Sequence, residues 1–463
     1  MMIFNSIAFV EFYLCVLLLV YLLRRLTKQI WVENLLLLVA SYYFYGSFKL
    51  SFLLCLLYIT IVNYGCGLLL ERKKSKTVLG MCVVLSFLPL ATFKYADFLF
   101  VEILGVASGS LLDGWVAPLG VSFFTFQALS YSIDVYREKI PAYRNFLDFS
   151  LFVAFFPTLL SGPIERGRNL LPQITVNRTF SWKKIYSAVC IFSFGLFKKI
   201  VIADRISTYV DSIYASPDTR TSVTLTFAAI LYSIQIYCDF SGYSDMAVGV
   251  ARGLGFNITQ NFHFPYFATS IKEFWRRWHI SLTSWFTEYV YFSLGGNRVN
   301  HKSRWLFNIS MIFLLSGIWH GAAWGFIIWG ALHAVLYLIE HFLGIQSKDF
   351  KPSVTFNIFY TPLVFVMVTV AWIFFRTESF NLAWQIISGI FTNGGLKLAT
   401  GASTMTFACN MMLLVLFVFA ELLLCYKKKL VMRPYVQELA LVTVWLMLTL
   451  FAASSDSFVY FQF

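Results

Sequence analysis

Histidine is the side chain best suited to move protons near neutral pH, and one of the six histidines in this sequence has unusual surroundings. His320 ends the otherwise apolar run 305–320, in the sequence Ser-Gly-Ile-Trp-His-Gly, which we interpret as part of a membrane span. An ionisable group inside a membrane span is costly and usually faces a cavity or a pathway. The glycines beside His320 permit close backbone approach and a break in the helix. His320 is therefore a candidate functional residue; a neutral histidine bonded to a neighbouring helix is the structural alternative.

A second candidate, His279, ends the stretch Phe-Trp-Arg-Arg-Trp-His. Arg276, Arg277 and Trp278 precede it, and arginine forks suit phosphate groups, so this cluster is a candidate site for an anionic substrate. Anchoring of Trp and Arg at the membrane interface is the alternative. We expect one helix over 271–290 that lies along the interface or lines a polar cavity.

Asp239 and Asp245 bound the segment Asp-Phe-Ser-Gly-Tyr-Ser-Asp and are further candidates for a polar binding site at the end of a span. Helix capping is the alternative for both, since Asp and Ser favour cap positions. We expect the remaining histidines to be structural: His333 a core residue, His263 a hydrogen-bonding loop residue, and two solvated residues at positions 301 and 341.

Other catalytic templates are missing from the sequence. It has no GxSxG, HExxH or GxxxxGK[ST] motif and no Cys/His set with metal-ligand spacing, so we expect no metal and no permanently bound cofactor. The eight cysteines fall mostly in apolar stretches without a CxxC pair. They are expected to be small core residues and not disulfides.

The elements that position these residues must be membrane helices. The 463 residues are 59% hydrophobic and only 13% charged, against about 25% charged in an ordinary soluble domain. The apolar runs are continuous, whereas a transmembrane barrel would alternate apolar and polar residues. We expect an all-α polytopic membrane protein with ten to twelve crossings, some re-entrant helices and one domain over 1–463.

The net charge of +13 comes from basic clusters at span ends, which mark the cytoplasmic side of a membrane protein and give no reason to expect nucleic acid. Placing 24–28, 71–76, 301–304 and 426–429 in the cytoplasm puts the tail, 454–463, on the extracytoplasmic side.

Six short motifs follow one another along the chain: Pro118-Leu-Gly-Val-Ser-Phe123, Ser161-Gly-Pro-Ile164, Asp239-Phe-Ser-Gly-Tyr-Ser-Asp245, Phe274-Trp-Arg-Arg-Trp-His279, Leu294-Gly-Gly-Asn-Arg298 and Gly317-Ile-Trp-His-Gly321. Together they resemble the membrane-bound O-acyltransferase (MBOAT) family. Within it, they are most similar to the bacterial branch of alginate and peptidoglycan O-acetylation proteins and the teichoic acid D-alanyl transfer protein.

This resemblance implies a funnel-shaped helical bundle in which an acyl donor enters from the cytoplasm. It places His320 at the position of the catalytic histidine and His279 at that of a second one. The chemistry is consistent, since a hydroxyl is a poor nucleophile until a base accepts its proton, and a neutral buried histidine suits that role. The acyl thioester carries the energy for the transfer.

The last six residues, Phe458-Val-Tyr-Phe-Gln-Phe463, resemble an aromatic hexapeptide that closes chains in this branch. The resemblance implies that Tyr460 is a transient acyl carrier that receives the acyl group at His320 and presents it outward. Anchoring of terminal aromatic residues at the interface is the alternative.

The expected function is transfer of acetyl from acetyl-CoA, across the bacterial inner membrane, to a separate extracytoplasmic protein of the SGNH-hydrolase type that modifies a cell-surface polysaccharide. The long segment after His320 favours the acetylating members. D-Alanine transfer from a carrier protein to teichoic acid is the alternative within the family. A transporter or flippase is the alternative outside it, although no internal repeat supports this; acylation of proteins or sterols is disfavoured by the terminal hexapeptide.

Overall fold

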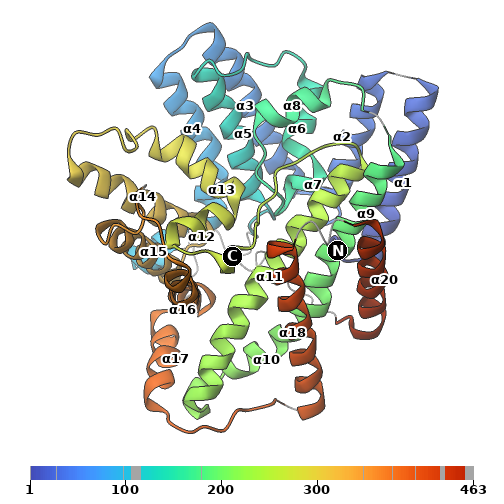
Figure 1. The fold of residues 1–463 in the computed structure, drawn as a ribbon. Coiled ribbons are helices and arrows are strands. Elements are labelled where there is room, and N and C mark those ends of the chain that lie inside the picture. Colours follow the sequence, from blue (N-terminus) through green and yellow to red (C-terminus); the bar gives the residue numbers. More distant parts are fainter. Residues whose placement is uncertain are drawn as a thin grey trace. The chain divides into compact units, whose positions relative to one another are not determined.

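The computed structural model describes residues 2–27, 29–96, 98–105, 116–178, 180–347, 349–377, 379–401, 403–427 and 433–453. Within these ranges all regular elements are helices, as expected for an all-α membrane protein (Figure 1). The acyl-carrier candidate Tyr460 and the rest of the tail 454–463 lie outside the described residues.

The chain forms two compact units that alternate along the sequence. Unit 1 comprises Met1–Phe192 and Tyr243–Gln260, and unit 2 comprises Ser193–Gly242 and Asn261–Phe463. Two helices, α9 (Trp182–Phe197) and α11 (Ser222–Gly253), contribute residues to both.

Unit 1 is a bundle in which α1 packs on α2, and α3 packs on α4 and α5 (Figure 1). Its further elements are α1 (Ile7–Leu26), α2 (Ile30–Gly46), α3 (Phe52–Arg72), α4 (Lys76–Leu90), η1 (Ala91–Tyr95), η2 (Phe98–Ile103), α5 (Val121–Tyr136), α6 (Phe146–Ala154), α7 (Phe156–Leu159) and α8 (Gly167–Ile174).

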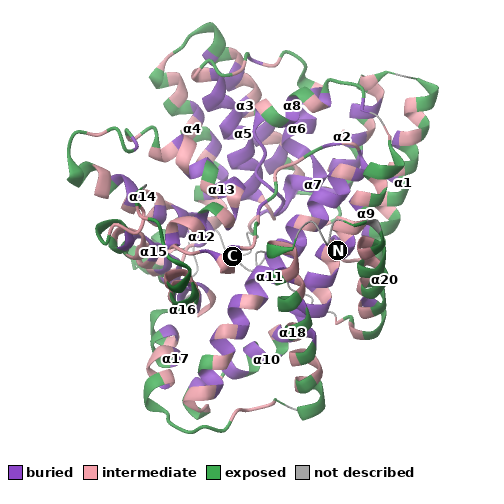
Figure 2. Cartoon of the chain, viewed as in Figure 1, coloured by how far each residue is buried: buried purple, intermediate pink, exposed green. Residues whose placement is uncertain are grey.

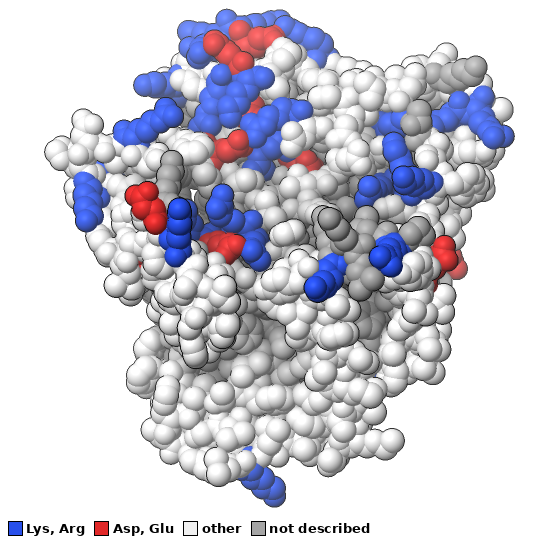
Figure 3. Space-filling view, in the orientation of Figure 1, with Lys and Arg blue, Asp and Glu red and all other residues white. Residues whose placement is uncertain are grey.

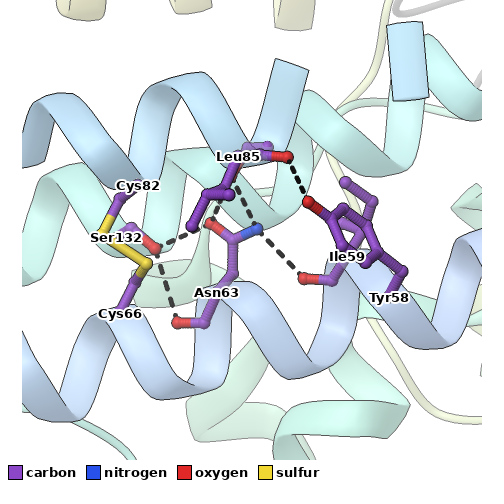
Figure 4. Close-up of a disulfide and its surroundings, with 8 residues drawn as sticks. Tyr58, Ile59, Asn63, Cys66, Cys82, Leu85 and Ser132 are labelled. Atoms are coloured by element: carbon purple, nitrogen blue, oxygen red, sulfur yellow. Dashed lines mark hydrogen bonds between the residues drawn. A yellow bond between two sulfur atoms is a disulfide. The ribbon is translucent and has the colours of Figure 1, made fainter. Parts of the chain in front are cut away.

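A disulfide in unit 1 contradicts the expectation of free cysteines. Cys66 of α3 is bonded to Cys82 of α4, with the two Cα atoms 5.9 Å apart (Figure 4). One turn away, Asn63 of α3 donates to Ser86 of α4 and accepts from Ser132 of α5. The disulfide could not be predicted from the sequence, because Cys66 and Cys82 face each other only after α3 and α4 have packed.

Unit 2 contains the helices that carry both candidate histidines. Its further elements are η3 (Lys198–Ala203), α10 (Asp204–Tyr214), η4 (Pro217–Thr219), η5 (Pro265–Phe267), α12 (Ile271–Arg277), α13 (Ile280–Trp285), η6 (Phe286–Tyr291), α14 (Lys302–His320), α15 (Trp324–Phe342), α16 (Val354–Thr377), α17 (Phe380–Thr392), α18 (Thr404–Tyr426) and α20 (Pro434–Phe451). Its core is a cluster of aromatic and aliphatic side chains that includes Trp278, Trp329 and Trp372.

Eight helices among the described residues are long and apolar enough to cross a membrane, and Tyr435–Phe451 is a shorter apolar helix. Two further helices, α2 and α14, have 17 and 19 residues, and apolar runs such as those of α6 and α7 form short buried helices. Within unit 2, α18 and α20 expose apolar side chains along much of their length, as lipid-facing helices do (Figure 2).

Charged side chains are unevenly distributed in each unit taken alone. In unit 1, basic side chains gather where α3 meets α4, at residues 72–76 (Figure 3). In unit 2, the region of α10 and α17 is almost free of charged groups in the same view. The pattern favours a cytoplasmic side at 72–76.

Candidate active site

His320 is the last residue of α14, and the helix ends there as the flanking glycines predicted. The next residue, Gly321, is extended, and α15 begins three residues later. A Cβ on Gly317 would lie 2.3 Å from the carbonyl oxygen of Phe326, and one on Gly330 would lie 2.5 Å from that of Phe313. Glycine therefore lets α14 and α15 touch backbone to backbone, which positions His320.

Aromatic rings enclose His320. The imidazole is 4% exposed, and its ring centre lies 4.9 Å from Trp319, 5.2 Å from Trp329 and 5.2 Å from Phe375. These residues come from α14, α15 and α16. Such an environment excludes water, which strengthens electrostatic interactions with any charge that forms there.

The expected single helix over 271–290 is wrong, because the chain breaks at Trp278 and His279. Trp278 is extended, and His279 has the left-handed conformation, with φ 43° and ψ 54°. Asn261 supplies the acceptors that a continuous helix would have supplied: its carbonyl oxygen accepts from the Ile280 amide, and its side chain accepts from the Ser281 amide. Tertiary contacts here override helix propensity.

The break places His279 in the core of unit 2, next to His320. The His279 ring is 1% exposed; its centre lies 4.7 Å from Phe240 and 6.5 Å from His320. Burial lowers the pKa of His279 to about 3, so this imidazole is neutral at physiological pH. The structure thus brings together two histidines that are 41 positions apart in the sequence.

The other predicted residues of this motif have different surroundings. Trp278 is buried, and its indole contacts Trp372, with ring centres 4.9 Å apart. Arg277 forms an ion pair with Glu273 one turn away and donates to the carbonyl oxygen of Phe264. Arg276 is exposed. The aromatic residue therefore joins the buried cluster, whereas the arginines remain at the surface.

Asp239 and Asp245 do not cap a helix, because α11 continues past both to Gly253. Asp239 is buried in unit 2 and pairs with Lys199 at 2.7 Å; the same ammonium pairs with Asp204 at 2.8 Å. Asp245 belongs to unit 1 and is half-buried. The structure assigns Asp239 to a buried ion-pair network, one residue before Phe240, whose ring contacts His279.

Sequence reasoning missed several buried polar groups in the spans. Lys198 donates to Ser241, and the hydroxyl of Tyr237 donates to the Glu421 carboxylate. The signal was available, since Lys198 and Glu421 are charged residues within apolar runs, where such residues are expensive.

The remaining histidines match their expected roles. His333 is buried and accepts a hydrogen bond from the Trp275 indole, whereas His263, His301 and His341 are exposed. Among the residues that the structure describes, no group of three or more His, Cys, Asp and Glu side chains could hold a metal ion.

Comparison with known proteins identifies the family of this helical membrane protein. The family model of the membrane-bound O-acyltransferases matches residues 37–384. A protein named probable alginate O-acetylase AlgI, from Pseudomonas syringae pv. tomato, is 38% identical over 86% of this chain and 77% of its own length.

Two further relatives carry other names. A peptidoglycan O-acetyltransferase of Helicobacter pylori is 33% identical over 82% of this chain and 77% of its own length. A teichoic acid D-alanyltransferase of Bacillus subtilis is 30% identical over 64% of this chain and 77% of its own length.

This chain belongs to the membrane-bound O-acyltransferase family. It is an O-acyltransferase of the bacterial inner membrane that crosses the bilayer several times.

Proposed function

We propose that this protein transfers an acetyl group from a cytoplasmic thioester, acetyl-CoA, for the O-acetylation of an extracytoplasmic polysaccharide. The relatives named for O-acetylation of alginate and peptidoglycan support the acetyl group and the acceptor class. The observation that carries the proposal is the buried pair His279 and His320, with ring centres 6.5 Å apart in a water-excluding aromatic cluster.

In this mechanism His320 is the general base. It accepts the proton of the acceptor hydroxyl while the hydroxyl oxygen attacks the thioester carbonyl carbon, and it returns the proton to the departing sulfur. Its position at the last residue of α14 supports this role, because the carbonyl end of a helix favours a positive charge.

His279 has a different role in the proposal. It is the residue just before α13 and is buried against Phe240, and both conditions disfavour a positive charge on it. We assign to it the orientation of a substrate by hydrogen bonding as a neutral imidazole. His279 and His320 then follow the general rule that different environments give two neighbouring titratable groups different roles.

We further propose that Tyr460 carries the acetyl group as an aryl ester and that a separate SGNH-type protein receives it outside. An acyl carrier would explain how a cytoplasmic thioester serves an extracytoplasmic acceptor. Arg276 and Arg277, at the surface of unit 2, are proposed contacts for the phosphates of the donor, because arginine forks match phosphate geometry.

The deciding experiment is mass spectrometry of the purified protein after incubation with labelled acetyl-CoA. We expect label on the C-terminal peptide in the wild type and none in His320→Ala. Label that persists in His320→Ala would contradict the role of His320. Label from a D-alanyl carrier protein but not from acetyl-CoA would favour teichoic acid D-alanylation, for which the Bacillus subtilis relative is named.

A further inference from the structure

Two hydrogen-bond donors on α15 are buried beside the histidine pair without a partner. The indole Nε1 of Trp329 and the imidazole Nε2 of His333 are both enclosed, and neither has a hydrogen-bond partner among the described residues. Both side chains are 0% exposed. Buried polar groups are normally paired, and an unmade bond is costly, so each unpaired group requires an explanation.

The protonation of His333 follows from its other nitrogen. Its Nδ1 lies 3.3 Å from the indole Nε1 of Trp275, which can only donate. Nδ1 is therefore the acceptor, and a neutral ring carries its hydrogen on Nε2. Nε2 is thus an N–H donor, like the indole nitrogen of Trp329.

The two donors lie on one face of one helix, next to the proposed base. Trp329 and His333 are four residues apart, so they lie one above the other, roughly 5–6 Å apart at Cβ. The Trp329 ring contacts both imidazoles, with centres 5.2 Å from His320 and 5.0 Å from His333. Trp329 therefore contacts the proposed base on one side and His333 on the other, and both unpaired N–H groups belong to side chains of α15.

We propose that Trp329 and His333 form the binding site for the acyl thioester of a pantetheine arm, an inference that rests on the proposed function. The Trp329 N–H donates to the thioester carbonyl oxygen, and the His333 N–H donates to the first amide carbonyl of the arm. Sulfur and two methylenes separate the thioester from that amide, a span comparable to one helical turn. Both acetyl-CoA and an acyl carrier protein present this arm.

Trp329 takes part in the chemical step. As the acceptor oxygen bonds to the carbonyl carbon, the C=O electron pair moves onto oxygen, and this oxyanion accepts the Trp329 N–H. When the electron pair returns, the C–S bond breaks and sulfur takes the proton that His320 holds, releasing the free thiol and the new ester. A donor aimed at an oxyanion in a water-excluded site stabilises the transition state more than the ground state.

The first test removes only the N–H of Trp329. Benzothienylalanine, incorporated by nonsense suppression, keeps the shape of tryptophan and replaces N–H with sulfur. We expect kcat to fall about a hundredfold or more, as for loss of one oxyanion donor, with KM and the thermal midpoint unchanged. The same replacement at Trp384, 57% exposed on α17, should leave kcat unchanged. An unchanged kcat at position 329 overturns the catalytic part of the inference.

The second test concerns His333 and the amide of the donor. With S-acetyl-N-acetylcysteamine, which keeps the amide, we expect His333→Leu to raise KM about tenfold and His333→Gln, which keeps an N–H donor, to recover most of the loss. With S-acetyl-hexanethiol, which has no amide, the variants and the wild type should have equal KM. Equal effects on the two donors would overturn the role of His333, since a purely structural defect acts on both.

The source of the arm and the proposed function are tested in parallel. Acetyl-CoA and an acyl carrier protein are compared as donors in every variant, and whichever the wild type uses is the physiological source. If the wild type transfers acyl groups but benzothienylalanine at position 329 leaves kcat unchanged, only this inference fails. If the wild type transfers from no thioester, the proposed function fails as well.

Discussion

His320 and His279 both stand where a helix stops, and this place decides what each can do. At the end of α14, His320 lies at the carbonyl end of a helix, which favours a positive charge. His279, in the left-handed conformation before α13, is 1% exposed, and this burial lowers its pKa to about 3. The same side chain is therefore suited to accept a proton at one position and to stay neutral at the other.

Replacing His320 tests the base directly. We expect His320→Ala to lose about 10²–10⁴-fold in transfer rate, the usual contribution of a positioned base, with unchanged expression and membrane insertion. His301→Ala, a change at an exposed histidine just before the first residue of α14, is the control. Turnover at the wild-type rate in His320→Ala would contradict the mechanism.

The burial of His279 makes stability depend on pH. An unfolded histidine titrates near pH 6.5, whereas burial lowers the pKa of His279 to about 3. Between these values the unfolded chain binds a proton that the folded chain does not, so acidification destabilises the fold by at most about 1.4 kcal/mol per pH unit. This contribution is fully present above pH 6.5 and is lost as the pH falls toward 3.

The measurement is the thermal midpoint in detergent from pH 7 down to pH 5. His279→Asn, which tolerates the left-handed conformation, should lose less stability over this interval than the wild type. If the thermal midpoints of the two proteins fall equally with pH, the folded protein binds a proton at His279 as readily as the unfolded chain does, which contradicts the prediction.

At the scale of elements, the contact between α14 and α15 controls the site. Gly317 and Gly330 each face a carbonyl group of the opposite helix, with no room for a methyl group. Because His320 ends α14 and Trp329 lies on α15, a small separation of these helices moves both residues. Protein interiors are too densely packed to absorb such a change without cost.

Gly317→Ala tests this contact. The new Cβ would lie 2.3 Å from the Phe326 oxygen, so α15 must move, and we expect a lower thermal midpoint together with at least a tenfold lower transfer rate. Gly80→Ala in α4, where a Cβ meets nothing within 4 Å, is the matched control and should behave like the wild type. Full activity in Gly317→Ala would show that the helices can separate without moving His320.

The disulfide between α3 and α4 is a second feature of element scale. It closes a loop of 16 residues, for which the chain-entropy estimate of stabilisation is about 3 kcal/mol. We expect a non-reduced digest to yield linked Cys66 and Cys82 peptides, and Cys82→Ser or a reductant to lower the thermal midpoint. Cys15→Ser, at an exposed free cysteine, should leave it unchanged. Unlinked peptides from the wild type would contradict the pairing.

At the scale of the whole molecule, the proposed donor and the final acceptor are expected on opposite sides of the membrane. From the basic clusters we expect 301–304 and 426–429 in the cytoplasm, where thioester donors are made, and the tail 454–463 outside. An acetylated polysaccharide of the cell surface lies beyond the bilayer. On the proposed function, the protein moves an acyl group across the membrane as well as transferring it.

Tyr460→Phe tests whether the tail makes that crossing. The change removes one hydroxyl, so we expect normal insertion, no label on the C-terminal peptide and loss of surface acetylation. His320→Ala should give the same loss for a different reason, since it blocks loading and not the carrier. Full surface acetylation in Tyr460→Phe would exclude the tyrosine as carrier and leave direct transfer to the partner protein.

Several features followed from the sequence alone because they depend on local chemistry. Continuous apolar runs require helices in a bilayer, so the helical class and the boundaries of α14, α15 and α16 were predictable. The glycine after His320 ended the helix as expected, and the histidine motifs identified the family.

Other features required the folded chain, because they depend on partners distant in sequence. Asn261 bonds to the chain where the expected helix breaks at His279. Asp239 pairs with Lys199 and lies inside α11, although the span was expected to end at this position. Cys66 meets Cys82 only because α3 and α4 pack together. The unpaired N–H groups of Trp329 and His333 were invisible for the same reason: a missing hydrogen bond exists only once every neighbour has been placed.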